Sequence, residues 1–268
     1  MNLKKRLYST MIGAIVAIVF LLYSSIRLFT VVSSAIAIMG FIEFLNIFNT
    51  KKHSLFYYSS IAIGICEILS FSMPRLWYVN YGIVFVVLLY LTISAVLYEK
   101  FSIGFENVAI VFGAGIYIAL FLYFILLLRF LPDGRDLLFT LCFTTWGRDV
   151  GAFLFGKKIK YGHVMLPAVS EKKTYEGAVF GIICAIAIVR ICSHWFSFGL
   201  TMQEIILIGF FMGVFGQLGD LIESWIKRSA HVTDSSHIIP GQGGILDTFD
   251  SFVFTAPLMY MFISIFSF

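Results

Sequence analysis

Residues 203–226 read QEIILIGFFMGVFGQLGDLIESWI, an apolar run that becomes polar only near its end. A helix needs about 20 mainly apolar residues to cross the hydrocarbon core of a bilayer. Continuous apolar runs favour membrane helices over a barrel, whose strands alternate in polarity. This stretch therefore predicts a membrane-spanning helix. Four small residues let another helix approach it closely; they are Gly209, Gly213, Gly216 and Gly219.

Similar apolar runs occur along the whole chain. Of its 268 residues, 60% are hydrophobic and 13% are charged, whereas soluble domains are nearer half apolar and a quarter charged. The first run resembles a signal peptide but lacks a clear cleavage site, so we expect a retained span. We predict an all-α polytopic membrane protein with about nine transmembrane helices, over residues 8–25, 28–48, 56–72, 77–97, 106–128, 135–156, 175–195, 203–226 and 247–267.

Lysine and arginine residues indicate the orientation, because short cytosolic loops carry an excess of them. With a cytosolic N-terminus, 13 of the 19 lie on the cytosolic side and five on the other. The polar loops 157–174 and 227–246 then both face the cytosol. We expect residues 1–130 to form a transmembrane scaffold of five spans, in which Glu43 and Glu67 are exceptional carboxylates. Residues 131–268 should form the catalytic half with four spans.

Two classes of site are not expected. The net charge of +4 is too small to indicate binding of nucleic acid. The four cysteines form no C-x-x-C pair, and the five histidines lack the spacing of a zinc motif.

The polar end of residues 203–226 supplies the first candidate site residues. Asp220, Glu223, Ser224 and Lys227 are spaced i, i+3, i+4 and i+7, which places them on one face of a helix. Ionisable groups in membrane spans are costly and usually functional. The alternative interpretation is an ordinary helix end with an internal ion pair.

A second candidate region is IPGQGGILDTFD, residues 239–250. Its glycine loop exposes backbone N–H groups, which can cradle phosphates. Asp247 and Asp250 follow at i, i+3 on the first turn of the last span. Carboxylate oxygens are ligands for Mg²⁺, although acidic residues at this position also suit the helix dipole.

The loop before residue 175 is rich in lysine, and clustered cations beside a membrane attract anionic headgroups and nucleotides. The positive-inside rule explains most of these lysines, so we assign only Lys172 and Lys173 to phosphate binding. Arg148 and Asp149 lie inside a predicted span. They form either a structural ion pair or a contact with the site.

These patterns meet in one long motif. Residues 224–250, SWIKRSAHVTDSSHIIPGQGGILDTFD, resemble the signature of phosphatidate cytidylyltransferases, also called CDP-diacylglycerol synthases. Residues 149–157, DVGAFLFGK, and residues 170–177, SEKKTYEG, also resemble that family. The signature departs from the family pattern at three positions, where lysine, histidine and arginine are usual; they are Thr233, Gln242 and Thr248.

The resemblance implies a nucleotidyl transfer in which CTP and phosphatidate give CDP-diacylglycerol and pyrophosphate. The residues expected to carry catalysis are Asp220, Ser224, Lys227, Asp234, Asp247 and Asp250. Those expected to bind phosphate are Lys172, Lys173, Arg228, Gly241, Gly243 and Gly244. Mg²⁺ is the implied cofactor, held first by Asp220 and Asp247 and next by Asp250, Asp234 or Glu223. A second cation is left open.

The implied partners are CTP and phosphatidate from the inner leaflet, which would enter sideways through a groove between the late spans. A homodimer is left open. We expect a bacterial inner-membrane protein whose active site faces the cytosol. The alternatives are a CTP-using polyprenol kinase, another CDP-lipid synthase, a membrane transporter, or an inactive homologue with a scaffold role.

Overall fold

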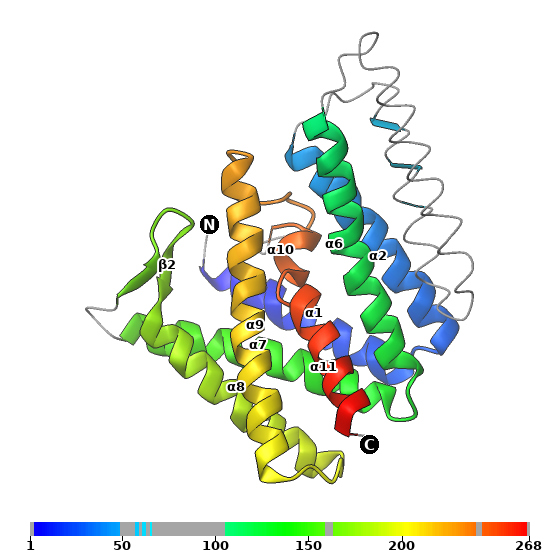
Figure 1. The fold of residues 1–268 in the computed structure, drawn as a ribbon, viewed down its shortest axis with the longest axis vertical. Helices are drawn as coiled ribbons and strands as arrows, with labels where there is room; N and C mark the ends of the chain where they lie inside the picture. Colours follow the sequence, from blue (N-terminus) through cyan, green and yellow to red (C-terminus); the bar gives the residue numbers. More distant parts are fainter. Residues whose placement is uncertain are drawn as a thin grey trace.

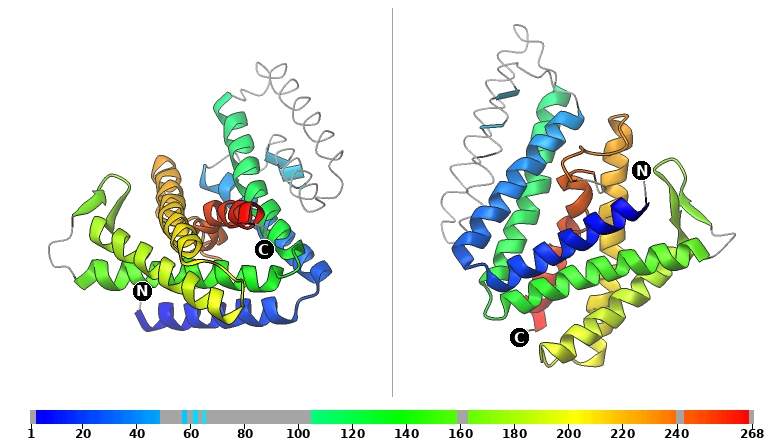
Figure 2. Two further views of the ribbon diagram at one scale, coloured as in Figure 1. Left: turned by 60° about the horizontal axis from the view of Figure 1, so that its bottom comes forward. Right: turned by 180° about the vertical axis from the view of Figure 1, so that it is seen from behind.

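The computed structural model describes residues 3–48, 57–58, 61–62, 65, 105–158, 163–239 and 243–266. In chain order the helices are α1 (Leu3–Tyr23), α2 (Ile26–Ile47), α6 (Phe105–Phe130), α7 (Gly134–Lys158), α8 (Tyr175–Trp195), α9 (Met202–Ser229), α10 (Ile245–Phe249) and α11 (Phe252–Phe266). Helices α2, α6 and α9 run roughly along the long axis of the molecule (Figure 1). Seen from behind, α1 lies alongside α7, and both cross the other helices (Figure 2).

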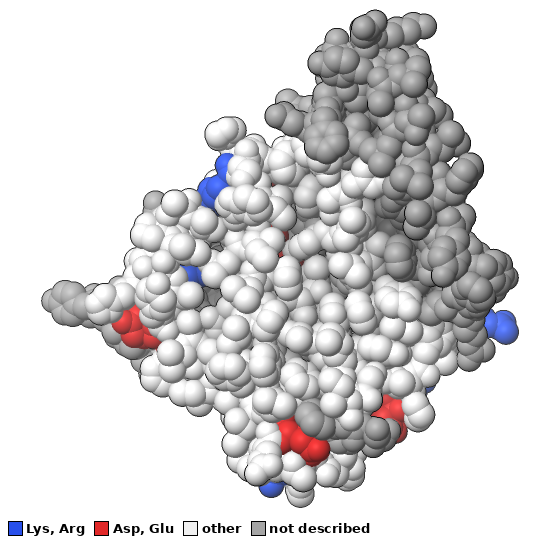
Figure 3. Space-filling view, in the orientation of Figure 1, with Lys and Arg blue, Asp and Glu red and all other residues white. Residues whose placement is uncertain are grey.

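Five segments within these ranges are long and apolar enough to cross a membrane. They are Ile26–Ile47, Ala109–Phe130, Tyr175–Trp195, Met202–Ser229 and Ile245–Ile265. The prediction of an all-α polytopic membrane protein is therefore confirmed. The face in Figure 3 fits this environment, because its charged side chains lie mostly near the margins of a broad uncharged surface.

The count of nine spans stays a prediction. Predicted span 77–97 and most of span 56–72 lie outside the described residues. Predicted spans 8–25 and 135–156 correspond to α1 and α7. The span test covers α1 only over Met11–Tyr23, and α7 carries the charged pair Arg148 and Asp149.

The last predicted span, 247–267, begins earlier than expected and is interrupted. The five-residue helix α10 precedes α11, and Asp250 and Ser251 lie between them. The Asp250 carboxylate accepts the N–H of Ser251 at 2.5 Å, so that N–H does not join the helical series. Gly219 of α9 packs on this junction, where an added Cβ would lie 2.6 Å from the carbonyl oxygen of Asp250.

The polar loop predicted at 157–174 contains a short hairpin. Strands β1 (Val164–Leu166) and β2 (Ser170–Thr174) pair antiparallel, with an irregularity in the register. Thr174 caps α8, because its hydroxyl accepts the N–H of Gly177 at 3.1 Å. The Glu176 carboxylate also contacts His163 Nδ1 at 2.8 Å. The hairpin is thus tied at both ends to the start of α8.

The glycines of α9 allow the predicted close helix packing. An added Cβ at Gly209 would lie 2.5 Å from the Cα of Ile186, and one at Gly213 would lie 2.9 Å from the Cα of Ile182. Both isoleucines belong to α8. Side chains larger than hydrogen at these positions would force the two helices apart.

The junction between the first two helices is held by an arginine. Arg129, at the end of α6, donates to the carbonyl oxygen of Ser24 at 3.0 Å. Its guanidinium carbon also lies 5.7 Å from the ring centroid of Phe29, within the range of a cation–π contact. These contacts fix α2 against α6, and both helices line the region described next.

Candidate active site

The candidate site centres on a lysine between two carboxylates. Lys227 Nζ lies 2.7 Å from Glu223 Oε2 on the same helix and 2.5 Å from Asp247 Oδ1 on α10. The three side chains are 12%, 5% and 8% exposed. The polar face of α9 and the start of the last span, two regions predicted from separate motifs, therefore converge.

Asp247 is held by more than this ion pair. Its Oδ2 accepts the N–H of Ser235 at 2.9 Å, the hydroxyl of Ser235 at 2.8 Å and the N–H of Gly244 at 2.8 Å. Hydrogen bonds to a charged acceptor are stronger than neutral ones. The Asp247 carboxylate thus fixes Ser235, the glycine loop and α9 relative to one another.

The hairpin contributes a second cation. Lys173 Nζ, from β2, lies 2.8 Å from Asp220 Oδ2 on α9. This contact agrees with the expectation that the lysine-rich loop lies beside the polar face of α9. The side chain of the neighbouring Lys172 lies outside the described residues.

A third cation is buried between helices. The Arg148 side chain is 2% exposed; it pairs with Asp149 and donates to the hydroxyl of Ser251, directly before α11, at 2.9 Å. Its Nε and Nη1 have no hydrogen-bond partner within the described part of the chain. The guanidinium packs against Gly216 of α9, where an added Cβ would overlap Nη1. The charged pair therefore joins α7, α9 and α11 at the site.

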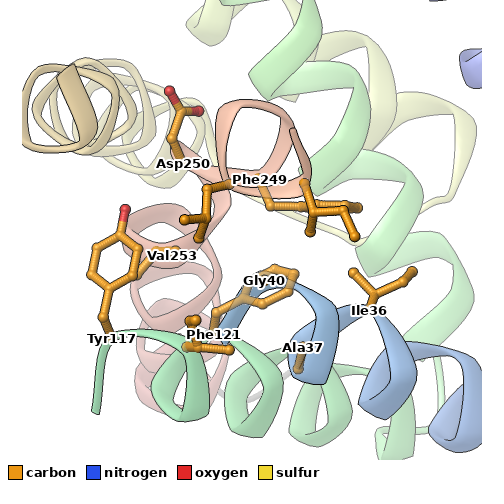
Figure 4. Close-up of a pocket in the computed structure, with 11 residues that line it drawn as sticks. Ile36, Ala37, Gly40, Tyr117, Phe121, Phe249, Asp250 and Val253 are labelled. Carbon is orange, nitrogen blue, oxygen red and sulfur yellow. The ribbon is translucent and has the colours of Figure 1, made fainter. Parts of the chain in front are cut away.

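Asp250 borders a small cavity that apolar side chains of α2, α6, α10 and α11 line. The Tyr117 hydroxyl and the Asp250 carboxylate lie on the same side of this cavity (Figure 4). The Tyr117 hydroxyl is buried and has no hydrogen-bond partner among the described residues. Asp250 interacts electrostatically with Asp220 and Glu223. The carboxylates are thus neighbours at the end of an apolar cavity.

Other predicted residues lie at the edge of this group or outside it. Asp234 is exposed, and the exposed Arg228 donates to the carbonyl oxygen of Val232 at 2.9 Å. Ser224 is half-buried on α9. Gly241 lies outside the described residues. Of the side chains that the structure describes, no three His, Cys, Asp or Glu lie close enough together to hold a metal ion.

The glycine loop is closed by its own backbone. Gly243 and Ile239 exchange two backbone hydrogen bonds, of 2.8 and 3.1 Å. Gly243 has a φ of 101°, which favours glycine, and an added Cβ would overlap the Asp247 carboxylate. Thr248 is one of the three positions that depart from the family pattern. Its hydroxyl donates to the carbonyl oxygen of Gly244, one turn earlier, at 3.0 Å.

The sequence motifs missed one residue of this region. Glu43 on α2 is 3% exposed, and its carboxylate accepts the N–H groups of Ile245 and Leu246 at 3.0 and 3.1 Å. The available signal was a lone carboxylate inside an apolar span, which is costly without a partner. Its partners lie about 200 residues further along the chain, so no local pattern identifies them.

Comparison with known proteins places these residues in a family context. A model described as the cytidylyltransferase family matches residues 4–266. The chain is 32% identical over 275 residues to a phosphatidate cytidylyltransferase of Bacillus subtilis (strain 168), with 99% of each chain covered. It is also 39% identical over 127 residues to a phosphatidate cytidylyltransferase of Staphylococcus haemolyticus, which covers 47% of this chain and 48% of that protein.

Proposed function

The chain belongs to the cytidylyltransferase family, and we propose that it transfers CMP from CTP to the phosphate of phosphatidate. The products are CDP-diacylglycerol, a precursor in phospholipid synthesis, and pyrophosphate. The observation that carries the proposal is the convergence of Lys227 and Asp247 of the family signature with Glu223, directly before it. The protein is a nucleotidyltransferase that is integral to the membrane.

The reaction joins two phosphates. A phosphate oxygen of the lipid forms a bond to the α-phosphorus of CTP, the bond from that phosphorus to the β-phosphate oxygen breaks, and pyrophosphate leaves with the electron pair. A phosphate monoester has a second pKa of about 6, so the attacking oxygen is already anionic near neutral pH. The protein therefore needs no strong base, and its main tasks are to position the phosphates and neutralise their charge.

The cations of the site suit these tasks. Lys227 and Lys173 lie on different elements, beside Asp247 and Asp220. We assign them to the phosphates, together with Lys172 and Arg228 at the edge. The backbone of Gly243 and Gly244 would approach the nucleotide. Asp234 and Ser224 are the remaining candidates for contacts with substrate.

Mg²⁺ is the cofactor that we propose, held first by Asp220 and Asp247, with Asp250, Glu223 and Asp234 as further candidates. All of these candidates are carboxylates, the ligand type that a hard cation prefers, but in the described part of the structure no three of them lie close enough together to hold an ion. Glu223 Oε1 is buried and unpartnered within the described ranges, and Asp250 interacts with the like charges of Asp220 and Glu223. When bound, the ion would supply positive charge to the triphosphate. A second cation stays open.

The lipid should reach this site from the bilayer. A small apolar cavity beside Asp250 lies between α2, α6, α10 and α11 (Figure 4), and we propose that an acyl chain of the lipid packs near this apolar side of the site. The proposed location is a bacterial inner membrane with the site facing the cytosol. In support, the ends of α2 and α9 and the start of α6, which this topology puts in the cytosol, share one end of the molecule (Figure 1).

The test is pyrophosphate release by purified protein with CTP, Mg²⁺ and phosphatidate, compared with the other nucleoside triphosphates. We expect release with CTP that depends on the lipid, and none with Asp247→Asn at unchanged expression. Incorporation of CMP into the lipid separates this reaction from that of a CTP-using kinase, which would transfer one phosphate. A folded preparation that releases no pyrophosphate would contradict the proposal.

A further inference from the structure

We infer that Glu43 is a positioning residue that holds the start of α10, and through it Asp247, in the geometry that nucleotidyl transfer requires. The inference rests on the proposed function. It assigns a role in the reaction to α2, a helix of the part expected to be scaffold. Glu43 need not touch either substrate, because it acts through the backbone that carries the glycine loop and Asp247.

The contacts of Glu43 carry the inference. Its Oε1 accepts the hydroxyl of Ser236 at 2.6 Å and the N–H of Ile245 at 3.0 Å. Its Oε2 accepts the hydroxyl of Ser235 at 3.2 Å and the N–H of Leu246 at 3.1 Å. A buried carboxylate with four hydrogen-bond donors is held in one orientation, and it holds its donors equally firmly.

These contacts satisfy groups that α10 cannot satisfy by itself. The first N–H groups of a helix have no partner within the helix. The residue before α10 is Gly244, which has no side chain to cap them. Glu43 takes the N–H groups of Ile245 and Leu246, while Asp247 takes that of Gly244. Two carboxylates from distant parts of the sequence thus accept the N–H groups at the start of α10.

Ser235 links the two carboxylates directly. Its hydroxyl oxygen lies 2.8 Å from Asp247 Oδ2 and 3.2 Å from Glu43 Oε2. A hydroxyl has one proton and donates to one acceptor at a time. Glu43 therefore competes with Asp247 for the hydrogen bond of the Ser235 hydroxyl. Gly244 leaves room for this arrangement, because an added Cβ would lie 2.5 Å from Glu43 Oε2 and 2.8 Å from Ser236 Oγ.

The first variant is Glu43→Gln, which keeps the shape of the side chain but points an amide N–H₂ group at hydrogen-bond donors. We expect kcat per folded molecule to fall at least about tenfold, since small displacements of reacting groups cost that much or more, whereas KM for CTP changes less. Backbone hydrogen exchange, measured without substrate, should be faster in the variant than in the wild type at Ile245 and Leu246. Along α8 the two proteins should exchange at the same rate. Glu43→Asp retains the charge and should recover part of kcat.

The matched control is Ser34→Ala. Ser34 lies on the same helix, is 6% exposed, and its hydroxyl has no hydrogen-bond partner among the described side chains. This variant should keep both kcat and the exchange pattern. If Glu43→Gln does not fold, Ser236→Ala removes the donor at 2.6 Å and should still lower kcat and speed exchange at Ile245.

The outcomes separate the two proposals. A folded wild type without pyrophosphate release contradicts the proposed function. If the wild type is active and the Glu43→Gln variant keeps full kcat, only the inference is contradicted. Where Glu43→Gln does not fold, full kcat in Ser236→Ala has the same meaning. The inference is also wrong if the tested variant only loses thermal stability, with kcat per folded molecule and the exchange of Ile245 unchanged.

Discussion

Lys227 Nζ lies 2.5 Å from Oδ1 of Asp247, a residue 20 positions further along the chain on another helix. Glu223, one turn earlier on α9, approaches the same ammonium at 2.7 Å. All three side chains are at most 12% exposed. The ammonium therefore balances two carboxylates that are almost fully buried, and its loss would leave both without their cation.

Lys227→Met should lower both stability and turnover. Removing one partner of a buried ion pair costs about 3–5 kcal/mol, and here two carboxylates lose their cation. The measurement is thermal unfolding in detergent together with pyrophosphate release. Arg190→Met is the matched control, because Arg190 is an exposed cation on α8 and its loss should leave both values nearly unchanged. Wild-type melting and turnover in Lys227→Met would contradict this prediction.

Asp220→Asn and Lys173→Met should separate stability from activity. Their side chains are 36% and 23% exposed, more than those of Lys227, Glu223 and Asp247. We expect a smaller loss of stability than for Lys227→Met but a fall in turnover of about 100-fold or more for Asp220→Asn, because it removes a charge proposed to hold Mg²⁺. Titration of Mg²⁺ against turnover checks this role. A large fall in melting temperature would assign Asp220 to the fold instead.

Several of these relationships could be predicted from the sequence. Helical spacing placed Asp220, Glu223 and Lys227 on one face, and the structure shows Lys227 bonded to Glu223 one turn away. The bounds 175–195 agree with α8, since polar residues interrupt the apolar run on both sides. Such features depend on local periodicity, which a sequence records directly.

The rest depends on contacts between distant segments. Glu43 and Ser236 are 193 positions apart, and nothing near either residue indicates the other. Gly219 likewise packs against the backbone at Asp250, 31 positions further along the chain on a different segment. Apolar patterning predicts where helices lie in the chain, but it does not predict which helix supplies the partner of a buried charge.

Arg148→Met should cost less stability than Lys227→Met. The ion-pair partner of Arg148, Asp149, has a side chain that is 52% exposed, so protein encloses that carboxylate less than it encloses Glu223 and Asp247. The remaining cost comes from the lost hydrogen bond to Ser251, at about 1 kcal/mol, and from the smaller side chain. Denaturation of both variants under the same conditions tests the ranking. The reverse order would mean that Arg148 contributes more to the free energy of unfolding than its contacts with Asp149 and Ser251 indicate.

Gly216→Ala should destabilise the site through Arg148. The added Cβ would overlap Nη1, lie 2.9 Å from the Cζ of Arg148 and lie 3.2 Å from Cγ2 of Thr255. The Arg148 side chain is 2% exposed, so we expect overpacking of about 1–3 kcal/mol. Turnover should fall as well, because a shifted guanidinium disturbs Ser251, beside Asp250.

The matched control for this substitution is Gly113→Ala on α6. An added Cβ there meets nothing within 4 Å, and alanine stabilises a helix by up to about 1 kcal/mol relative to glycine. Its melting temperature should therefore equal or exceed that of the wild type. The two variants add the same methyl group to a helix, so a difference between them reports the space around each glycine. Equal melting temperatures would mean that Arg148 can be displaced at little cost, and that the close contact with α9 does not hold its guanidinium in place.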